Sequence, residues 1–234
     1  MTSLLALEAS TEACSVALLH NGKLVEDFRM LPRAHTQFLL PMVDEILREN
    51  KLWLQDLGAI AFAVGPGSFT GLRVCAGVVQ GLAFAAEKPV IAISTLQAMA
   101  QHAVQNLGLP DGAIILPALD ARMDEVYWGH YCVRDGFAYA VAEDRLGAPE
   151  ALLLSVQDSQ QVAEGGAVGI GSGWQYCSRI ALALPASNMH IETYPRASAV
   201  LSLAEQAFAR GELLSAEQAQ PVYLRDSVAW QKSS

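Results

Sequence analysis

The stretch GAIAFAVGPGSFTGLRVCAGVVQGLAFAAE, residues 58–87, decides the fold of this chain. Its apolar run 59–64 is short enough for a strand buried on both faces, and a glycine-rich turn follows. Residues 69–86 form an apolar segment too long for a strand and predict a helix. Gly77 and Gly81 lie one turn apart on it, and each costs roughly 1 kcal/mol relative to alanine. Close approach of a second backbone would offset that cost, so we expect a packing surface; the alternative is a helix that only crosses its own sheet.

The composition is that of a globular protein with a poor affinity for nucleic acids. The chain has 234 residues, 52% hydrophobic and 17% charged, which allows a sizeable core in one large domain or two small ones. Its 15 lysines and arginines against 24 acidic residues give a net charge of −9. Nonspecific nucleic-acid binding depends on Lys and Arg that neutralise phosphates, so we expect weak RNA binding by the chain alone.

The sequence predicts a cytoplasmic protein with no membrane association. Residues 1–4 contain no basic region ahead of the apolar stretch, and the apolar runs of membrane-spanning length are broken by a charge or a glycine. The cysteines lack the spacing of zinc or redox sites, which favours buried free thiols in a reducing compartment. They are Cys14, Cys75, Cys132 and Cys177.

The first half of the chain predicts a three-stranded meander followed by alternating helices and strands. We expect strands at 4–7, 14–20, 23–30, 59–64 and 89–93, and helices at 35–50, 69–86 and 95–106. Asn21-Gly22 is a strong hairpin signal between the second and third strands. Pro41 lies within the helical pattern 35–50 and marks either a first-turn position or a kink. Thr95 is the expected N-cap of the helix that follows it.

The second half repeats this order after a boundary at residues 107–112. Residues 117–122, PALDAR, align with residues 5–10, LALEAS, and Asp135-Gly136 is a second hairpin signal. Further strands are expected at 114–119, 125–133, 137–142, 167–170 and 189–191. Helices are expected from Pro149 to about Ser155, at 174–182 and at 197–210, with Gly211 as the last C-cap.

Two such repeats predict a duplicated α/β fold of the ribonuclease-H-like, actin-like type, in which nucleotide lies between two lobes. We place an N-terminal lobe at residues 1–108 and a C-terminal lobe at 109–234. Helix 197–210 is a candidate to cross back to the first lobe.

Four residues are candidates for a site between the lobes. Glu8 and Asp120 close equivalent strands, so we expect them to face each other across a cleft. Carboxylates placed there bind a metal–phosphate complex or orient water, or alternatively accept hydrogen bonds from nearby backbone. Ser10, in the turn after the first strand, and Gly171, where the backbone could approach an adenosine or simply turn, complete the set. ATP is the candidate ligand, with no firmly bound cofactor expected.

The sequence contains no complete catalytic constellation. The turn Gly65–Ser68 is not a P-loop, because no Gly-Lys-Ser/Thr follows and Pro66 lacks an N–H donor, so a structural turn is the simpler interpretation. The five histidines lack the spacing of a helical metal site. A Gly-x-Ser-x-Gly elbow is also absent.

Several segments together resemble one known family. They are LLALEASTEACSVAL, RAHTQFLLPM, AFAVGPGSFTGLRVCAGVVQGLAFA, ISTLQAMA, ALDARMDEVYWGHY and PVYLR, and they span nearly the whole chain. In these segments the chain is similar to the bacterial TsaB family, also called YeaZ. The resemblance implies an actin-like fold with two lobes. It also implies a role in making threonylcarbamoyladenosine next to the anticodon of tRNAs that read codons beginning with A.

The resemblance further implies a non-catalytic subunit that activates a catalytic paralogue, TsaD. TsaD carries a metal-binding His-x-x-x-His segment that is missing here. The family usually has Asp where this chain has Glu8, which weakens a nucleotide role for that residue. The expected partners are TsaD, in a heterodimer through first-lobe helices, an ATPase, TsaE, and tRNA only through the complex. A homodimer through the same helices is the alternative assembly.

The expected partner interface lies on the first-lobe helices. Its residues are His35, Leu39, Gly71, Arg73, Gly77 and Gly81. The competing hypothesis is an independent cleft enzyme, a nucleotide hydrolase, kinase or glycoprotease-like peptidase, which would use the paired acids and glycine turns.

Overall fold

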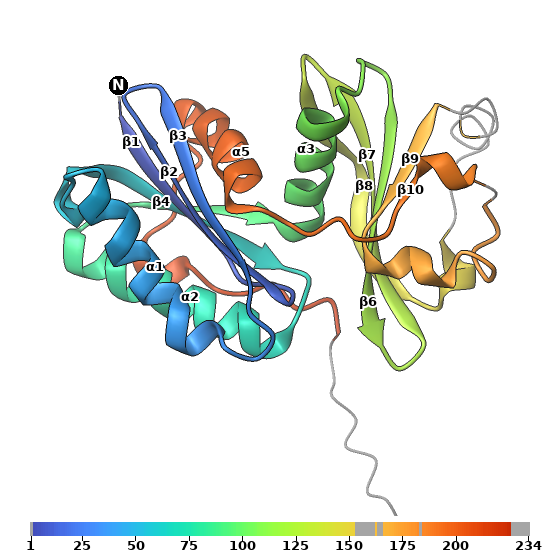
Figure 1. The fold of residues 1–234 in the computed structure, drawn as a ribbon, viewed down its shortest axis with the longest axis horizontal. Helices are drawn as coiled ribbons and strands as arrows, with labels where there is room; N and C mark the ends of the chain where they lie inside the picture. The colour runs from blue at the N-terminus through green and yellow to red at the C-terminus, as the bar shows by residue number, and fades with distance from the viewer. Residues whose placement is uncertain (1, 153–161, 163–165, 183, 226–234) are drawn as a thin grey trace, which may run out of the picture.

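The first lobe is built on a five-stranded sheet of mixed pairing (Figure 1). The computed structural model describes residues 2–152, 162, 166–182 and 184–225. The first sheet has the order β3-β2-β1-β4-β5 and antiparallel pairing among its first three strands. β4 and β5 continue it parallel to β1. Its strands are β1 (Ser3–Glu8), β2 (Ala13–His20), β3 (Lys23–Met30), β4 (Leu57–Gly65) and β5 (Val90–Ser94).

The second sheet repeats this topology strand for strand. Its order, β8-β7-β6-β9-β10, again combines an antiparallel meander with two parallel strands. The strands are β6 (Ile114–Arg122), β7 (Glu125–Arg134), β8 (Phe137–Gly147), β9 (Ala167–Ile170) and β10 (Met189–His190). The predicted duplicated, ribonuclease-H-like α/β fold with two lobes is therefore confirmed, and β1 and β6 occupy equivalent central places.

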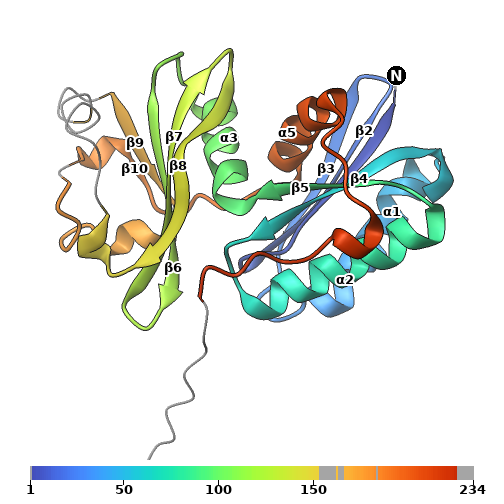
Figure 2. The same ribbon diagram turned by 180° about the vertical axis from the view of Figure 1, so that it is seen from behind.

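The helices that follow the fifth strand of each repeat are exchanged between the lobes (Figures 1 and 2). α3 (Thr95–Leu107) follows β5 but buries its apolar face mainly against the second sheet. α5 (Ala197–Arg210) follows β10 but packs on the first sheet. The packing thus crosses the boundary expected at residues 108 and 109, and α5 returns to the first lobe as anticipated.

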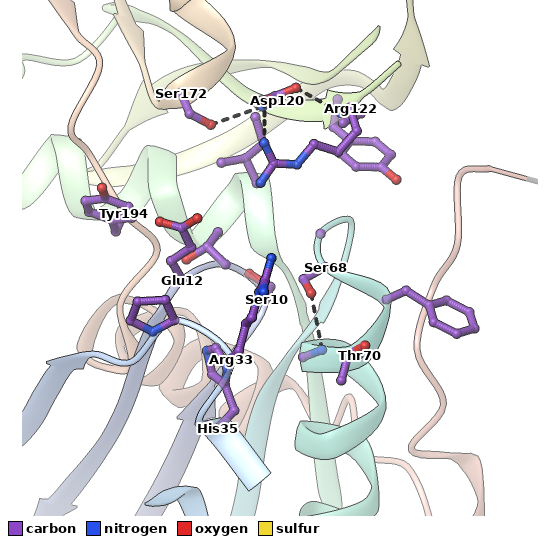
Figure 3. A pocket seen from close by; sticks show the side chains of 18 of the residues that line it. Ser10, Glu12, Arg33, His35, Ser68, Thr70, Asp120, Arg122, Ser172 and Tyr194 are labelled. Carbon is purple, nitrogen blue, oxygen red and sulfur yellow. Dashed lines mark hydrogen bonds and ion pairs between the residues drawn. The ribbon is translucent and has the colours of Figure 1, made fainter. Parts of the chain in front are cut away.

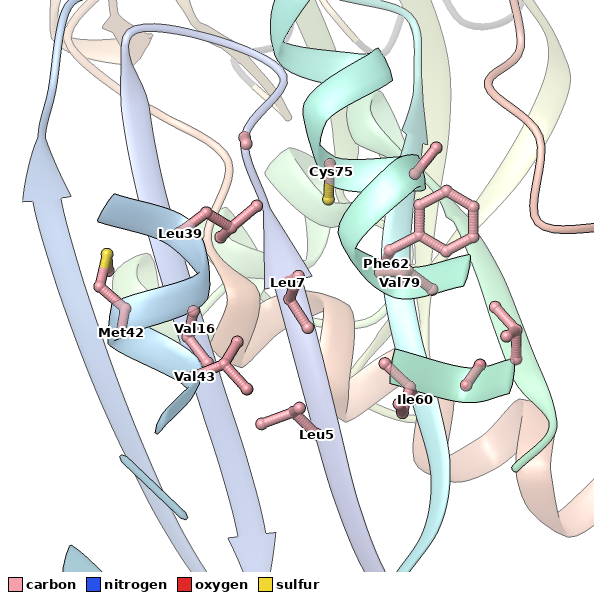
Figure 4. Packing of buried hydrophobic residues seen from close by; sticks show 14 of the residues in the cluster. Leu5, Leu7, Val16, Leu39, Met42, Val43, Ile60, Phe62, Cys75 and Val79 are labelled. Atoms are coloured by element: carbon pink, nitrogen blue, oxygen red, sulfur yellow. The ribbon is translucent and has the colours of Figure 1, made fainter. Parts of the chain in front are cut away.

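The core of the first lobe follows from the alternation of side chains along β1. All six residues of β1 are buried. Leu5 and Leu7 face α1 (His35–Glu49) and α2 (Phe69–Ala86), where they pack with Leu39 and Phe62 (Figure 4). Leu4 and Ala6 face α5 on the opposite side of the sheet. Each large aliphatic side chain buried in this way stabilises the lobe by roughly 1.5–3 kcal/mol.

The glycine-rich turn between β4 and α2 packs against the chain's own backbone. A Cβ at Gly67 would collide with the carbonyl oxygen of Ser10, and one at Gly71 with that of Ala9. The Ser68 N–H donates to the Ser10 carbonyl over 2.7 Å, and the Ser68 hydroxyl caps α2 by accepting from the Gly71 N–H. This close packing supports the interpretation of a structural turn.

Both hairpins and the two most apolar helices agree with the sequence predictions. Asn21 and Asp135 have φ of 50° and are followed by glycines of positive φ, as two-residue hairpin turns require. α2 and α5 have the predicted bounds, and Gly211 ends α5 in the left-handed region. Pro41 lies inside α1 rather than in its first turn.

Three local predictions are wrong. Ser94, not Thr95, caps α3, since its hydroxyl accepts from the N–H groups of the second and third helical residues. The expected helix 174–182 is a short 3-10 turn at Ser172–Tyr176, because the Trp174 indole is buried and donates to the Leu116 carbonyl. Cys177 is exposed rather than buried. The helix expected from Pro149 begins with a 3-10 turn, and most of its remainder falls outside the described residues.

Candidate functional site

An open cleft of about 1390 Å³ lies between the lobes. The first lobe contributes the turn after β1, the loop before α1 and the N-terminus of α2. The second lobe contributes the end of β6 and the segment after β9. Figure 3 shows Ser10 and Arg33 on one side of this cleft and Asp120 and Arg122 on the other.

Glu8 does not face Asp120 across the cleft, which corrects the sequence prediction. Its side chain is fully buried and is not among the lining residues. Oε1 accepts hydrogen bonds from the backbone N–H and the hydroxyl of Ser10, both at 2.5 Å, whereas Oε2 has no partner among the described residues. Burial raises the pKa of Glu8 to about 7, although the Ser10 hydrogen bonds act in the opposite direction. Because Ser10 already engages it and the protein encloses it, Glu8 is not placed to hold a metal–phosphate complex.

Asp120 and Ser10 do line the cleft, as predicted. The Asp120 carboxylate is occupied by Arg122, whose backbone N–H donates to Oδ1 over 2.8 Å and whose Nη1 lies 3.3 Å from Oδ2. The Asp120 N–H donates to the Ser172 hydroxyl over 3.0 Å. The carboxylate that sequence reasoning offered as a ligand is therefore already paired with a cation.

Gly171 serves the packing of the second lobe and does not line the cleft. Its φ is +93°, and a Cβ there would collide with the Ala118 carbonyl oxygen of β6. The Gly171 N–H donates to the His190 carbonyl over 3.0 Å. The sequence left two interpretations of Gly171 open, close approach of the backbone to an adenosine or a turn of the chain, and this position is a turn. The neighbouring Ser172 is the residue that lines the cleft.

Four arginines line the cleft and were missed by the sequence analysis as cleft residues. They come from the loop before α1, from α2, from the end of β6 and from the C-terminal segment. They are Arg33, Arg73, Arg122 and Arg225. Each lies in one of the segments that carry the family resemblance, and this is the signal that could have found them. Arg73 was predicted, but as an interface residue.

The six residues expected at a partner interface divide into a buried and an exposed group. Leu39 and His35 are buried, and His35 Nε2 lies 3.1 Å from the Ala13 carbonyl oxygen. Gly71 packs on Ala9. These three therefore pack within the first lobe, which corrects their assignment to a partner interface. The other three, Arg73, Gly77 and Gly81, are exposed on α2.

The exposed side of α2 has open space where the chain has glycine. A Cβ at Gly77 or Gly81 would meet no atom of the described residues within 4 Å, so the backbone of those residues does not explain either glycine. Figure 2 shows the segment after α5 returning past α2, where Gln80 donates to the Ala219 carbonyl. A groove lined by Gly77 and Tyr223 separates α2 from this returning segment.

α2 is also unusually apolar for a helix with an exposed side. Among the described residues it is the one helix whose length and composition would allow it to cross a membrane, and 39% of it is buried in the protein. The same part of the chain contains no group of three or more His, Cys, Asp or Glu residues able to hold a metal ion.

Comparison with known proteins assigns the chain to a family. The family model described as "TsaD: tRNA N6-adenosine threonylcarbamoyltransferase" matches residues 29–233. A protein of Escherichia coli K12 named "tRNA threonylcarbamoyladenosine biosynthesis protein TsaB" is 41% identical, over 98% of this chain and 97% of its own. Its namesake in Haemophilus influenzae is 40% identical, over 98% and 96%. The chain belongs to the TsaB family.

Solved structures of TsaB-like proteins share this fold from end to end. A Pseudomonas aeruginosa structure described as similar to the peptidase YeaZ superimposes with a TM-score of 0.89 at 45% identity, over 96% of this chain and 100% of its own. A second, named YeaZ from the same organism, gives 0.87 at 44% identity over the same shares. The resemblance stated from the sequence motifs is thereby confirmed.

Proposed function

We propose that this chain is a non-catalytic subunit in tRNA threonylcarbamoyladenosine biosynthesis, which docks on a TsaD-like paralogue and activates it. The family gives the pathway, and one observation supports the docking: the glycines of α2 face open space. A helix glycine that no intramolecular contact explains is suited to close approach by another chain's helix.

The proposed docking face is a stripe along α2. Arg73, Gly77, Gly81 and Phe84 follow one another at intervals of four, four and three residues, so they share one side of the helix. All four are exposed, and the Phe84 side chain is 75% accessible to solvent. The two glycines allow a partner helix to approach closely, and the neighbouring Phe84 side chain offers it a large apolar contact. A paralogue of the same fold would present equivalent helices, so α1 and α2 would form a helical bundle with them.

The state of the candidate site residues in the described part of the chain supports the non-catalytic part of the proposal. Glu8 is sealed from the cleft, Asp120 is paired with Arg122, and the described residues offer no metal cluster. The alternative of an independent cleft enzyme rested on the pair Glu8 and Asp120, and in the part of the chain that the structure describes Glu8 lies outside the cleft lining and Asp120 is paired with Arg122. The proposal also includes a TsaE-like ATPase as third partner, contact with tRNA only through the complex, and a cytoplasmic location.

Reconstitution with the paralogue tests this function. Threonylcarbamoyladenosine is measured in digested tRNA after incubation with the paralogue alone, with the chain alone and with both. We expect product only from the pair. Gly81→Leu should abolish heterodimer formation in analytical ultracentrifugation while leaving the far-UV circular dichroism unchanged, because the added side chain meets open space.

A matched control places the same bulk elsewhere. Ala209→Leu adds a leucine at an exposed position of α5 and should leave docking and activity intact. Product formation by the chain alone would refute the non-catalytic role. Wild-type affinity of Gly81→Leu for the paralogue would refute the docking face but leave the pathway in place.

A further inference from the structure

Arg73 is a fixed cation at one end of the proposed docking face on α2. It is exposed, and among the described residues it has no acidic partner. Its Nε donates to the Tyr223 hydroxyl over 3.1 Å, and its guanidinium lies 3.9 Å from the centre of the Phe69 ring. The terminal nitrogens, Nη1 and Nη2, have no acceptor in the same part of the chain. An arginine held in this way keeps its charge and two donors available to a carboxylate.

The segment that returns past α2 carries the Tyr223 hydroxyl and is attached on both sides of it. Before Tyr223, the Ala219 carbonyl accepts a hydrogen bond from Gln80 of α2 over 2.9 Å. After it, Arg225 is paired over 2.6 Å with Glu125 of β7, in the second lobe. Contacts with both lobes therefore set the position of Tyr223 and of the guanidinium that it holds.

The docking face is polar at one end and apolar at the other. Arg73 lines the groove between α2 and the returning segment, which has a volume of about 290 Å³ and is also lined by Gln80 and Gln220. Phe84, at the opposite end, is 75% accessible to solvent. The two ends are about 16 Å apart at a rise of about 1.5 Å per residue. A helix that packs along this face therefore meets a cation and, about three turns further on, a large apolar side chain.

The sequence of α2 favours a different chain, rather than a second copy, as the source of an acid for Arg73. Phe69–Ala86 contains no Asp or Glu. Two copies that met through this face would therefore bring no carboxylate of one α2 to Arg73 of the other. They would also bring together two chains of net charge −9, which repel each other.

We propose that Arg73 determines the specificity of docking by pairing with a carboxylate on the helix of the paralogue that packs along α2. This pair rests on the proposed docking function and adds the chemistry of the partner helix. That helix should carry an acidic side chain opposite Arg73 and an apolar surface opposite Phe84. Tyr223 is a positioning residue, because it acts through the guanidinium that it holds. A pair covered by the partner helix loses much of its contact with water, so removal of one charge leaves the other without compensation.

Surface plasmon resonance between the full chain and the paralogue tests the pair. Arg73→Gln should weaken docking by about tenfold or more, because the partner's carboxylate would stay covered without a cation. As sodium chloride rises from about 0.05 to about 0.5 M, docking of the wild type should weaken more steeply than docking of Arg73→Gln. Tyr223→Phe keeps the ring and removes the hydroxyl. It should weaken docking of the wild type and have no further effect in the Arg73→Gln background.

A charge swap identifies the acid and does not depend on the stability of one variant. Arg73→Glu should abolish docking. Each Asp and Glu on the equivalent helices of the paralogue is then changed in turn to Arg, and one of these changes should restore docking of Arg73→Glu. The control is Arg134→Gln, which removes the charge of an exposed arginine at the end of β7 and should dock as the wild type does.

Wild-type affinity of Arg73→Gln would overturn the pair, and so would a swap series in which no change restores docking of Arg73→Glu. If Gly81→Leu still abolishes docking in that case, α2 remains the docking face and only the assigned pair is wrong. A wild-type chain that does not bind the paralogue would instead refute the proposed function, and the pair with it.

Discussion

Ser94 and Thr95 are adjacent hydroxyl residues with opposite roles at the start of α3. The Ser94 hydroxyl caps the helix and donates to Asp144 of β8 over 2.5 Å, so it links β5 to the second lobe. The Thr95 hydroxyl is buried and has no hydrogen-bond partner in the described part of the chain. Sequence reasoning chose Thr95 because both residue types cap helices and the boundary was uncertain by one position.

This difference gives a prediction with a built-in control. Ser94→Ala should lower the free energy of unfolding by about 1–2 kcal/mol, because a cap is lost and Asp144 loses a donor. Thr95→Val should be neutral or slightly stabilising, since it replaces an unsatisfied hydroxyl by a methyl group. Urea titration of both variants measures the two values. A larger loss in Thr95→Val than in Ser94→Ala would contradict the assigned cap.

The buried Glu8 carboxyl predicts a pH dependence of stability. Since its pKa is raised from 4.5 to about 7 in the folded protein, the folded state retains a proton that the unfolded state releases over that window. Its contribution is therefore fully favourable below pH 4.5 and is lost as the pH rises through about 7. Between pH 5 and pH 8 the wild type should lose about 2 kcal/mol more than Glu8→Gln does.

Unfolding by urea at several pH values measures this difference. Glu12→Gln is the control, because Glu12 is exposed in the turn that follows β1 and should leave the wild-type profile unchanged. Parallel profiles for Glu8→Gln and the wild type would show that Glu8 does not titrate in this range.

At the scale of single elements, periodicity and turn residues predicted most of the fold. The apolar run of α2 and the hairpin dipeptides depend on local geometry alone, so their bounds could be read correctly. The expected helix 174–182 failed because Trp174 packs into the second core, where Gly169 and Gly173 make room for tight packing. Such a contact between distant residues leaves no periodic signal.

The candidate site was predicted in part for a similar reason. The alignment of the repeats correctly brought Asp120 to the cleft, and Ser10, chosen from the turn after the first strand, also lies there. It could not show that Glu8 turns away from solvent, because a carboxylate at a strand end has the same sequence signature whether it is open or enclosed. The cleft arginines come from four separate segments, and only the folded chain brings them together.

The glycines of α2 predict opposite effects of the same substitution within one helix. Gly77→Ala and Gly81→Ala should each raise the free energy of unfolding by about 0.5–1 kcal/mol, since the added methyl meets open space and alanine favours the helix. Gly71→Ala should lower it by about 2 kcal/mol or more, because its Cβ would collide with the Ala9 carbonyl oxygen.

Thermal and urea unfolding of the three variants measure these changes. If α2 is the docking face, the two stabilised variants should bind the paralogue more weakly than the wild type. Stabilisation together with unchanged docking would separate these glycines from the interface, and a stable Gly71→Ala would contradict the packing of the turn.

At the scale of the whole molecule, the exchange of α3 and α5 ties the two lobes into one unit. Each helix has an apolar face, and a sequence pattern indicates that such a face is covered without showing which sheet covers it. α5 covers Leu4, Ala6 and Ile91 of the first sheet, although it lies at the far end of the chain. A cut at the sequence boundary therefore separates each sheet from a helix that it needs.

Two fragments test this consequence. Residues 2–108 alone should bind the dye ANS and unfold without a cooperative transition, because they expose the inner face of the first sheet and also the apolar face of α3. Residues 2–94 joined by a flexible Gly/Ser linker to residues 195–222 should unfold cooperatively, because α5 again covers Leu4 and Ala6. Circular dichroism during urea titration distinguishes the two. Cooperative unfolding of the first fragment as a monomer, or its absence in the second, would contradict the exchanged packing, because the inner face of the sheet would then not depend on α5.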